Sequence, residues 1–227
     1  MDGNNRWARQ RGLPRAMGHK AGIETIRRVA EACDNAGIRV LTVYAFSTEN
    51  WSRPQDEVET LMRLFSESIR REVDEMARRG VEMRFSGRIL ELPESLQAQM
   101  HDANERTRKD ARAVLNVAVN YGGRQEIVDA VRLMAEAGAD LTRLDEAGLN
   151  AHLYTSGLPD PDLLIRTAGE MRISNFLLWQ AAYAEFYSTA TLWPDFGEED
   201  LLEALRAYHG RVRRFGARPE EISHRGR

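Results

Sequence analysis

The chain has 227 residues, with 32 lysines and arginines against 35 aspartates and glutamates, for a formal net charge of −3 at pH 7. Its composition, 42% apolar and 30% charged, is typical of a globular protein and excludes a disordered or fibrous chain. A single cysteine, Cys33, excludes a disulfide framework and a cysteine-based zinc cluster. No run approaches the roughly 18 apolar residues of a membrane span, and the polar start lacks the apolar region of a signal peptide. We therefore expect one domain over residues 1–227 and a cytoplasmic, soluble protein.

Basic side chains gather at both ends of an otherwise acidic chain. Residues 1–30 carry seven basic side chains against two acidic ones, which gives a net charge of +5. Residues 206–227 carry seven arginines against two glutamates, again +5. This distribution indicates an anionic ligand. The sequence pI near 6.0 is far below the value above 9 typical of a nucleic-acid-binding domain, so we expect no nucleic acid partner.

Apolar residues at helical spacing alternate along the chain with short runs rich in β-branched and aromatic residues. In chain order this pattern predicts helix 22–36, strand 38–46, helix 57–79, strand 81–85, helix 95–112, strand 114–119, helix 123–137, strand 163–165, helix 175–184, strand 189–193 and helix 198–214. The alternation predicts βαβ units, and hence an α/β fold with a mostly parallel central sheet flanked by helices on both faces. The chain opens on Asp2-Gly3-Asn4, which is typical of a loop at the end of a strand. We therefore expect that the first strand is missing from this chain.

Polar clusters follow three of the expected strands, at residues 47–53, 120–124 and 166–170. In open parallel sheets, ligands bind beyond the carboxyl ends of the strands, where these clusters would meet. The sequence therefore predicts a binding site at this edge of the sheet.

The first candidate anion site lies near the N-terminus. Gly3, followed by polar residues, could present backbone N–H groups to phosphate oxygens, and Arg6 and Arg15 could hold those oxygens with paired N–H groups. Asp2 could bind Mg²⁺, which takes a few carboxylates together with substrate phosphates. The alternative is a frayed, solvated N-terminus. For His19, capping or surface exposure is the alternative to phosphate contact.

A second candidate anion site contains Arg166, Arg172 and Ser174, close to the start of an expected helix. Ordinary helix capping by Ser174 is the alternative, and the two are compatible. Glu185 stands among apolar and aromatic residues, so it is either exposed on one face or placed to meet a metal or an arginine. The apolar stripe of helix 57–79 could form plain core or line an apolar tunnel, and spacing does not separate the two.

Six motifs stand in order over nearly the whole chain. They are Met-Asp-Gly-Asn-x-Arg-Trp-Ala at 1–8, Gly-His-Lys-x-Gly at 18–22, Tyr-Ala-Phe-Ser-x-Glu-Asn-Trp-x-Arg-Pro at 44–54, Asn-Tyr-Gly-Gly-Arg at 120–124, Asp-Leu-Leu-Ile-Arg-Thr-x-Gly-Glu-x-Arg-Ile-Ser-Asn-Phe-Leu-Leu-Trp-Gln at 162–180, and Leu-Trp-Pro-Asp-Phe at 192–196. Together they resemble the signatures of cis-prenyltransferases, nearest to bacterial undecaprenyl diphosphate synthases. Ala168 and Asn5 depart from the family pattern, where glycine is common.

The resemblance implies condensation of isopentenyl diphosphate with an allylic diphosphate, normally farnesyl diphosphate. The product would be a long-chain cis-polyprenyl diphosphate such as undecaprenyl diphosphate, the precursor of a lipid carrier for cell-wall synthesis. It also implies Mg²⁺ as cofactor, a homodimer, an apolar tunnel between helix 57–79 and the sheet, and loose membrane contact through the product. The element Arg214-Phe215-Gly216 would complete the site of the partner subunit.

The resemblance also implies residue roles. Asp2 would be catalytic and bind the metal, Asn50 would lie close to the proton that is lost, and Glu185 would lie near the metal and the neighbouring subunit. The implied substrate-binding residues are Gly3, Asn4, Asn5, Arg6, Trp7, Arg15 and His19 for the allylic diphosphate, Ser47, Thr48, Glu49, Trp51 and Arg53 in a mobile loop, and Arg166, Arg172 and Ser174 for isopentenyl diphosphate.

Two alternatives stay open at this stage. Bulky Met62, Leu64 and Phe65 could shorten the tunnel of a shorter-chain synthase. A non-catalytic partner subunit would have no physical need for the full set of charged residues named above.

Overall fold

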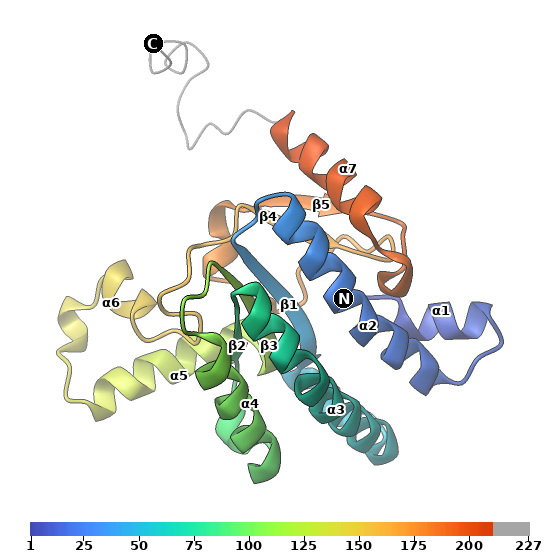
Figure 1. Ribbon diagram of the computed structural model, residues 1–227. Coiled ribbons are helices and arrows are strands. Elements are labelled where there is room, and N and C mark those ends of the chain that lie inside the picture. The colour runs from blue at the N-terminus through green and yellow to red at the C-terminus, as the bar shows by residue number, and fades with distance from the viewer. Residues whose placement is uncertain (211–227) are drawn as a thin grey trace.

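The computed structural model describes residues 1–210 of the chain (Figure 1). Its helices are α1 (Asn4–Gln10), α2 (Arg15–Asn35), α3 (Gln55–Arg79), α4 (Glu94–Thr107), α5 (Gly123–Glu136), α6 (Glu146–Asn150) and α7 (Glu198–His209). Its strands are β1 (Val40–Ser47), β2 (Val81–Ser86), β3 (Ala113–Tyr121), β4 (Leu163–Arg166) and β5 (Glu185–Ser188). This is the α/β alternation that the sequence predicts.

The central sheet has three parallel strands in the order β1-β3-β2. β3 lies in the middle and is buried from Leu115 to Tyr121. In a strand that is covered on both faces, successive side chains all point into the protein, so polar residues do not alternate with apolar ones. This explains the nearly continuous apolar run of β3. The carboxyl ends of β1 and β3 lie together, since Ser47 is in register with Tyr121.

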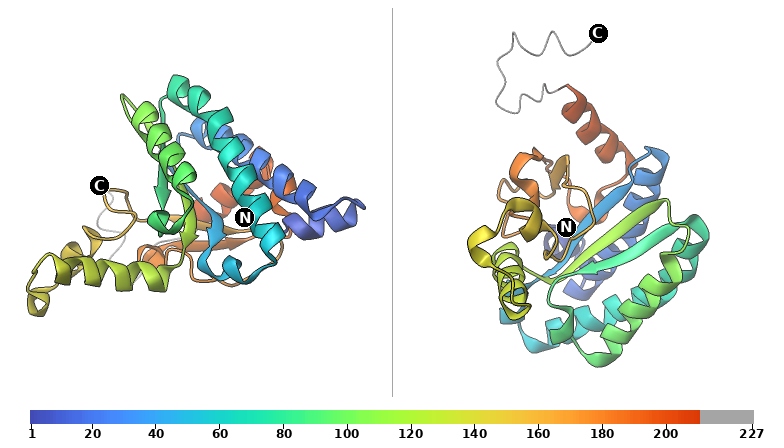
Figure 2. Two further views of the ribbon diagram at one scale, coloured as in Figure 1. Left: turned by 90° about the horizontal axis from the view of Figure 1, so that it is seen from below. Right: turned by 90° about the vertical axis from the view of Figure 1, so that its left-hand side faces the viewer.

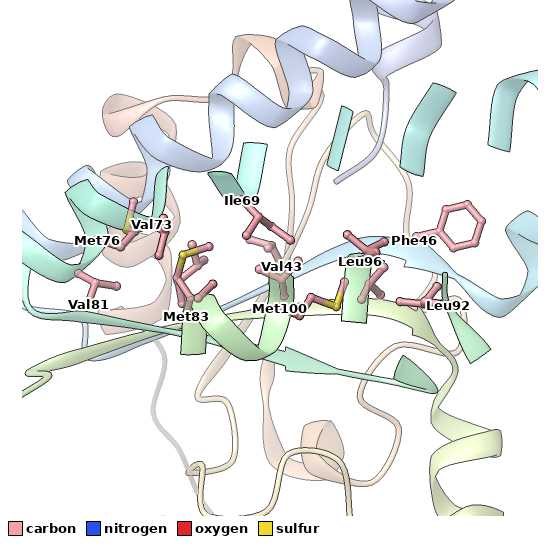
Figure 3. Packing of buried hydrophobic residues seen from close by; sticks show 14 of the residues in the cluster. Val43, Phe46, Ile69, Val73, Met76, Val81, Met83, Leu92, Leu96 and Met100 are labelled. Atoms are coloured by element: carbon pink, nitrogen blue, oxygen red, sulfur yellow. The ribbon is translucent and has the colours of Figure 1, made fainter. Parts of the chain in front are cut away.

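The main core lies between this sheet and the helices α3 and α4. Figure 3 shows Ile69 and Val73 of α3 and Leu96 and Met100 of α4 packed against strand residues such as Val43. The stripe of α3 that the sequence left open between core and tunnel serves as core at its C-terminal half. α2, α3 and α4 lie on one side of the sheet and α5 on the other (Figure 2).

The expected single sheet is divided in two. β4 and β5 form a separate parallel pair, with Leu163 in register with Glu185. Within residues 1–210, β1 and β4 have no strand between them, and a groove of about 500 Å³ lies there, lined by both strands and by residues of α2 and α7. The strand that the sequence analysis expects before Asp2 stays a prediction.

Two expected elements near the C-terminus are wrong. Residues 175–184 form no α-helix; only a short 3-10 turn occurs, at Gln180–Tyr183. Asn175 and Leu177 have positive φ angles of 61° and 46°, which a right-handed helix does not allow. The last strand is Glu185–Ser188 rather than 189–193, because β5 pairs with the short β4 and the ladder ends there.

Other boundaries moved by several residues. α2 begins at Arg15, seven residues before the expected start, and α4 ends at Thr107 instead of 112. The sequence analysis missed the short helices α1 and α6. α7 is described to His209, while residues 211–214 of the expected last helix and the element Arg214-Phe215-Gly216 lie outside the described residues.

Candidate active site

A cavity of about 810 Å³ opens where the start of the chain meets the carboxyl ends of β1 and β4. Its walls come from residues 1–6, α2, the end of β1, the start of α3 and the end of β4. Most of the predicted site residues line it: Asp2, Gly3, Asn4, Asn5, Arg6, Arg15, His19, Ser47, Glu49, Asn50, Arg53, Arg166 and Ser174. The two candidate anion sites, about 160 residues apart in the chain, thus share one cavity.

Asp2 is fixed at the centre of this wall by its backbone and its side chain. Its N–H donates to Thr167 Oγ1 and its carbonyl accepts from the same hydroxyl, both at 2.9 Å. Its Oδ2 accepts from Arg166 Nη2 at 3.0 Å, and its Oδ1 accepts from the N–H of Gly3 at 2.8 Å. Partial burial raises the pKa of Asp2, but the hydrogen bond and charge of Arg166 outweigh that effect and leave the pKa below its ordinary value. Asp2 is therefore an ionised carboxylate beside a cation.

Two glycines bring the N-terminal segment close enough to form this wall. A Cβ on Gly18 would lie 2.1 Å from the carbonyl oxygen of Asn4, and one on Gly22 would lie 2.5 Å from its Oδ1. Glycine weakens a helix interior by about 1 kcal/mol relative to alanine, yet α2 contains both. Close packing of α1 on α2 accounts for their use. The N-terminus is therefore not frayed but packed on α2.

Glu57, at the start of α3, binds three basic residues. Its carboxylate lies 2.5 Å from Arg15 Nη1, 3.1 Å from Arg53 Nη1 and 3.4 Å from His19 Nε2. These charges hold the pKa of Glu57 below its ordinary value, although burial opposes them. Burial lowers the pKa of His19, against the opposing effect of Glu57. Its buried Nε2, although 3.4 Å from the Glu57 carboxylate, makes no hydrogen bond. This nitrogen is a candidate donor to a phosphate oxygen.

Glu170 binds the arginines of the second anion site, as Glu57 binds those of the first. Its Oε1 accepts from Arg6 Nη2 at 3.0 Å, and its Oε2 accepts from Arg172 Nη1 at 2.5 Å. Arg166, which binds Asp2, also donates to the carbonyl oxygen of Arg172 at 3.0 Å, while its buried Nε has no partner. The arginines therefore form two clusters, each arranged around a glutamate.

The segment after β1 is ordered by its own side chains. The Ser47 N–H donates to Asn50 Oδ1 at 3.1 Å, and the two residues form a capping box at the turn Thr48–Ser52. Trp51 donates from its ring nitrogen to Asn120 Oδ1 at 2.7 Å. Glu49 accepts from Asn175 Nδ2 at 2.8 Å, which ties this segment to the second anion site.

Five predicted site residues do not line the cavity. Trp7 donates to Asp195 at 2.6 Å on the side of α1, and Trp51 is bonded to Asn120. Thr48 is not among the residues that line the cavity. Arg172 is not among them either, but it pairs with Glu170, which also binds Arg6 in the cavity wall. Glu185 begins β5 beside Leu163, at the end of the two-stranded sheet opposite Arg166, so the fold of residues 1–210 does not bring it to Asp2.

Three residues of the site, Glu57, Glu170 and Asn175, are functional positions that the sequence did not predict. Glu57 follows Arg53 by four residues, the spacing of an ion pair on one helical turn, and that signal was present in the sequence. Its contacts with Arg15 and His19 depend on the packing of α3 against α2, for which the sequence carries no local signal.

The donor set fits a magnesium ion that is completed by substrate oxygens. Among residues 1–210 there is no cluster of three or more His, Cys, Asp or Glu side chains suited to a metal. Mg²⁺ commonly uses one or two carboxylates together with phosphate oxygens and water. Asp2, about half buried at the cavity wall, supplies one such carboxylate.

The far end of the cavity is apolar. It is lined by Ile23 and Ile26 of α2 and by Leu61, Met62 and Phe65 of α3, with Ala45, Phe46 and Val119 from the sheet. One cavity therefore combines a cationic rim with a hydrocarbon interior. No helix within residues 1–210 combines the length and apolar character needed to cross a membrane.

Comparisons with known proteins agree with this arrangement. Residues 1–216 match a family described as "Putative undecaprenyl diphosphate synthase". An isoprenyl transferase of Heliobacterium mobile is 52% identical over 220 residues, covering 95% of this chain and 85% of that protein. A ditrans,polycis-undecaprenyl-diphosphate synthase of Legionella pneumophila, named as specific for (2E,6E)-farnesyl diphosphate, is 47% identical over 95% of this chain and 92% of its own length. The crystal structure of lavandulyl diphosphate synthase from Lavandula x intermedia, in complex with dimethylallyl diphosphate, superposes with a TM-score of 0.91 at 39% identity over 95% of both chains.

Proposed function

The chain belongs to the undecaprenyl diphosphate synthase family of cis-prenyltransferases, and from this premise we propose that it extends farnesyl diphosphate with isopentenyl diphosphate units. The product is a long-chain cis-polyprenyl diphosphate such as undecaprenyl diphosphate, which serves as a lipid carrier precursor. The observation that carries this proposal is the single cavity with two arginine clusters at its rim and an apolar interior.

The two arginine clusters suit two diphosphates held side by side. Arg15, His19 and Arg53 surround one position, and Arg6, Arg166 and Arg172 surround the other. Holding both substrates in one geometry lowers the entropy cost of the reaction, which in well-oriented systems is worth about 7–11 kcal/mol. We assign the first cluster to the allylic diphosphate and the second to isopentenyl diphosphate. Arg6, which the sequence analysis expects at the allylic diphosphate, is thereby reassigned, because it pairs with Glu170.

Glu57 and Glu170 act as substitutes for the substrates in the free protein. Each supplies negative charge where a diphosphate would otherwise have to neutralise clustered arginines. The arginines are thereby held in position before binding, and the incoming diphosphate takes over their hydrogen bonds.

The reaction needs stabilisation of the diphosphate that leaves the allylic carbon. Donors that are already oriented toward developing negative charge are effective because they need not reorganise during the reaction. The N–H groups of Arg15, His19 and Arg53, the cluster assigned to the allylic diphosphate, take this role. Asp2 would hold Mg²⁺, which would supply positive charge to neutralise the diphosphate. The proton lost from the isopentenyl unit leaves near Asn50, beside the Ser47 backbone, and passes to the released diphosphate, because an amide side chain is not a base.

The apolar end of the cavity receives the growing chain. Burial of hydrocarbon is favourable by about 0.8 kcal/mol per CH₂ group, so each added isoprene unit drives the chain toward that end. We propose that this end continues as a tunnel between α3 and the sheet, and that side chains such as Met62 and Phe65 limit the product length.

We further propose a homodimer in the cytoplasm. Glu185 lies away from Asp2 in its own protomer, which is consistent with a role toward a neighbouring subunit. Contact with the membrane then occurs through the product rather than through a spanning segment.

The test is incorporation of labelled isopentenyl diphosphate with farnesyl diphosphate and Mg²⁺, with products resolved by chain length. A ladder of long products supports the proposal, and products that stop after one or two additions indicate a shorter-chain synthase. If the wild-type protein incorporates no label while the same assay detects a known cis-prenyltransferase, the proposed enzymatic activity is refuted. The alternative of a non-catalytic partner subunit then stands. Omission of Mg²⁺ should abolish the label in the product.

A further inference from the structure

Glu126 is a buried acidic residue outside the cavity. It lies in the first turn of α5, and its side chain is only 1% exposed. Its Oε2 accepts from the hydroxyl of Tyr121 at 2.5 Å and from Gln180 Nε2 at 3.0 Å. Gln180 Nε2 also donates to Thr155 Oγ1 at 2.7 Å. The mechanism proposed above makes no use of this group.

Two oxygens of this group have no hydrogen-bond partner. They are Oε1 of Glu126 and Oε1 of Gln180, both buried. Each is an acceptor, and an ionised carboxylate has no proton to donate, so an ionised Glu126 leaves both unsatisfied. A protonated Glu126 carries one O–H group. Gln180 Nε2 already binds Glu126 Oε2, so the free carboxyl oxygen and the free amide oxygen belong to two groups that are joined by a hydrogen bond.

The charged and titratable groups around Glu126 do not compensate a negative charge. Tyr121 of β3 donates to it, and the ring of Tyr154 lies 6.2 Å from that of Tyr121. Asp129, one turn further on α5, is bound by Arg88 at 2.7 Å and by the hydroxyl of Tyr154. No ion pair joins Glu126 to a basic side chain among residues 1–210. Burial raises the pKa of Glu126 more than its polar neighbours lower it, which are the side chains of Gln180 and Tyr121 and the backbone N–H groups of Tyr154 and Thr155.

Gln180 ends a loop that reaches the active site. Residues 174–177 include three positive φ angles, at Ser174, Asn175 and Leu177, and such backbone persists only when its surroundings hold it. At its start, the Asn175 carbonyl accepts from the Gly123 N–H at 2.7 Å. Ser174 and Asn175 line the cavity. The far end of the loop is held through Gln180.

We propose that Glu126 is a protonated positioning residue, whose acid O–H donates to Gln180 Oε1 while Gln180 Nε2 donates back to Glu126 Oε2. This acid–amide pair holds the loop that presents Ser174 and Asn175 to the second anion site. The protonation of Glu126 is inferred from the hydrogen bonds and does not depend on the proposed function, whereas the positioning role rests on that function.

The first experiment compares the pH dependence of stability in the wild type and Glu126→Gln. The glutamine amide reproduces every hydrogen bond of the neutral acid. A buried acid with a raised pKa keeps its proton in the folded state after the unfolded state has lost it. The wild type therefore loses stability relative to the variant as pH rises from the ordinary value near 4.5 to the folded value.

The expected result is a ratio of folding equilibrium constants, variant over wild type, that rises by up to about tenfold per pH unit in that range. A carboxylic acid C=O band, present in the infrared spectrum of the wild type at pH 7 and missing from Glu126→Gln, is the second expected result. The exposed Glu94→Gln serves as control and should show neither effect. If the ratio of folding equilibrium constants does not change with pH and the carboxylic acid band is missing from the wild type, Glu126 is not protonated.

The positioning role is tested by titrating isopentenyl diphosphate into Gln180→Met, which keeps the side-chain length and removes both amide contacts. Binding of isopentenyl diphosphate should weaken at least about tenfold, while binding of farnesyl diphosphate changes little. Glu126→Gln should bind both as the wild type does. Equal weakening of both ligands, or no change, overturns the positioning role. These binding and stability measurements need no turnover, so an inactive wild type refutes the proposed function without affecting them.

Discussion

Replacement of Asp2 by alanine tests whether this carboxylate is catalytic or structural. The side chain makes two hydrogen bonds, one from the Gly3 N–H and one from Arg166 Nη2. The Arg166 side chain is only 15% exposed, so it loses a charged partner in a poorly solvated place. It keeps its bond to the carbonyl of Arg172, which limits the loss. We expect a cost of about 2 kcal/mol in the free energy of unfolding.

For a chain of this length, about 2 kcal/mol corresponds to a fall in melting temperature of roughly 4–8 °C. Turnover should fall far more, by at least about 100-fold, because a charged group that acts on the departing diphosphate is removed. The assay is incorporation of isopentenyl diphosphate at a temperature well below both melting points. Thermal unfolding is measured on the same samples.

The matched control is Asp195→Ala. Asp195 also accepts hydrogen bonds from two partners, Trp7 and Arg11, but it does not line the cavity. It should lose a few degrees of melting temperature and keep most of its turnover. If Asp2→Ala retains turnover within about tenfold of the wild type, or if both variants lose turnover in proportion to stability, the catalytic assignment of Asp2 is wrong.

The pH dependence of the Asp2 contribution has a definite sign. Arg166 holds the pKa of Asp2 below its ordinary value, against the opposing effect of burial. The stabilisation is therefore complete above the ordinary value near pH 4 and is lost as pH falls through the folded value. The difference in melting temperature between wild type and Asp2→Ala should shrink on acidification, and a difference that grows would contradict the ion pair.

Three further predictions concern the walls of the cavity. Glu57→Gln removes the carboxylate that competes for Arg15, so inorganic diphosphate should bind roughly fivefold more tightly at low salt, as measured by titration calorimetry; weaker binding would show that Glu57 supports the site instead of occupying it. Phe65→Ala enlarges the apolar end of the cavity, so chromatography of the products should show longer chains than the wild type makes. An unchanged distribution of chain lengths would show that another residue limits the product length. Gly18→Ala places a Cβ 2.1 Å from the Asn4 carbonyl oxygen, so the free energy of unfolding, measured by denaturant titration, should fall by about 1–3 kcal/mol. The comparison is Gly210→Ala, where φ is −72° and the nearest atom would lie 3.5 Å from the Cβ.

The sequence alone determined the elements whose signals are local. β3 is a nearly continuous apolar run, and α3 carries a long apolar stripe and ends at Gly80, which adopts the left-handed cap with φ of 65°. Both were predicted within two residues. The alternation of such elements predicted parallel strands and a site at their carboxyl ends, and the family motifs named most of the residues that line the cavity.

Only the tertiary structure decided the features that depend on residues far apart in the chain. Residues 175–184 avoid a helix because Asn175 caps the start of α5 and Phe176 stacks on Tyr44 at 4.6 Å. These contacts outweigh local helix propensity, which is worth less than about 1 kcal/mol per residue. The pairing of Arg6 with Glu170 spans 164 positions, so no window of sequence contains it. Ion pairs of this kind form only after the elements have packed, and for that reason the two glutamates that organise the rim were found in the structure and not in the sequence.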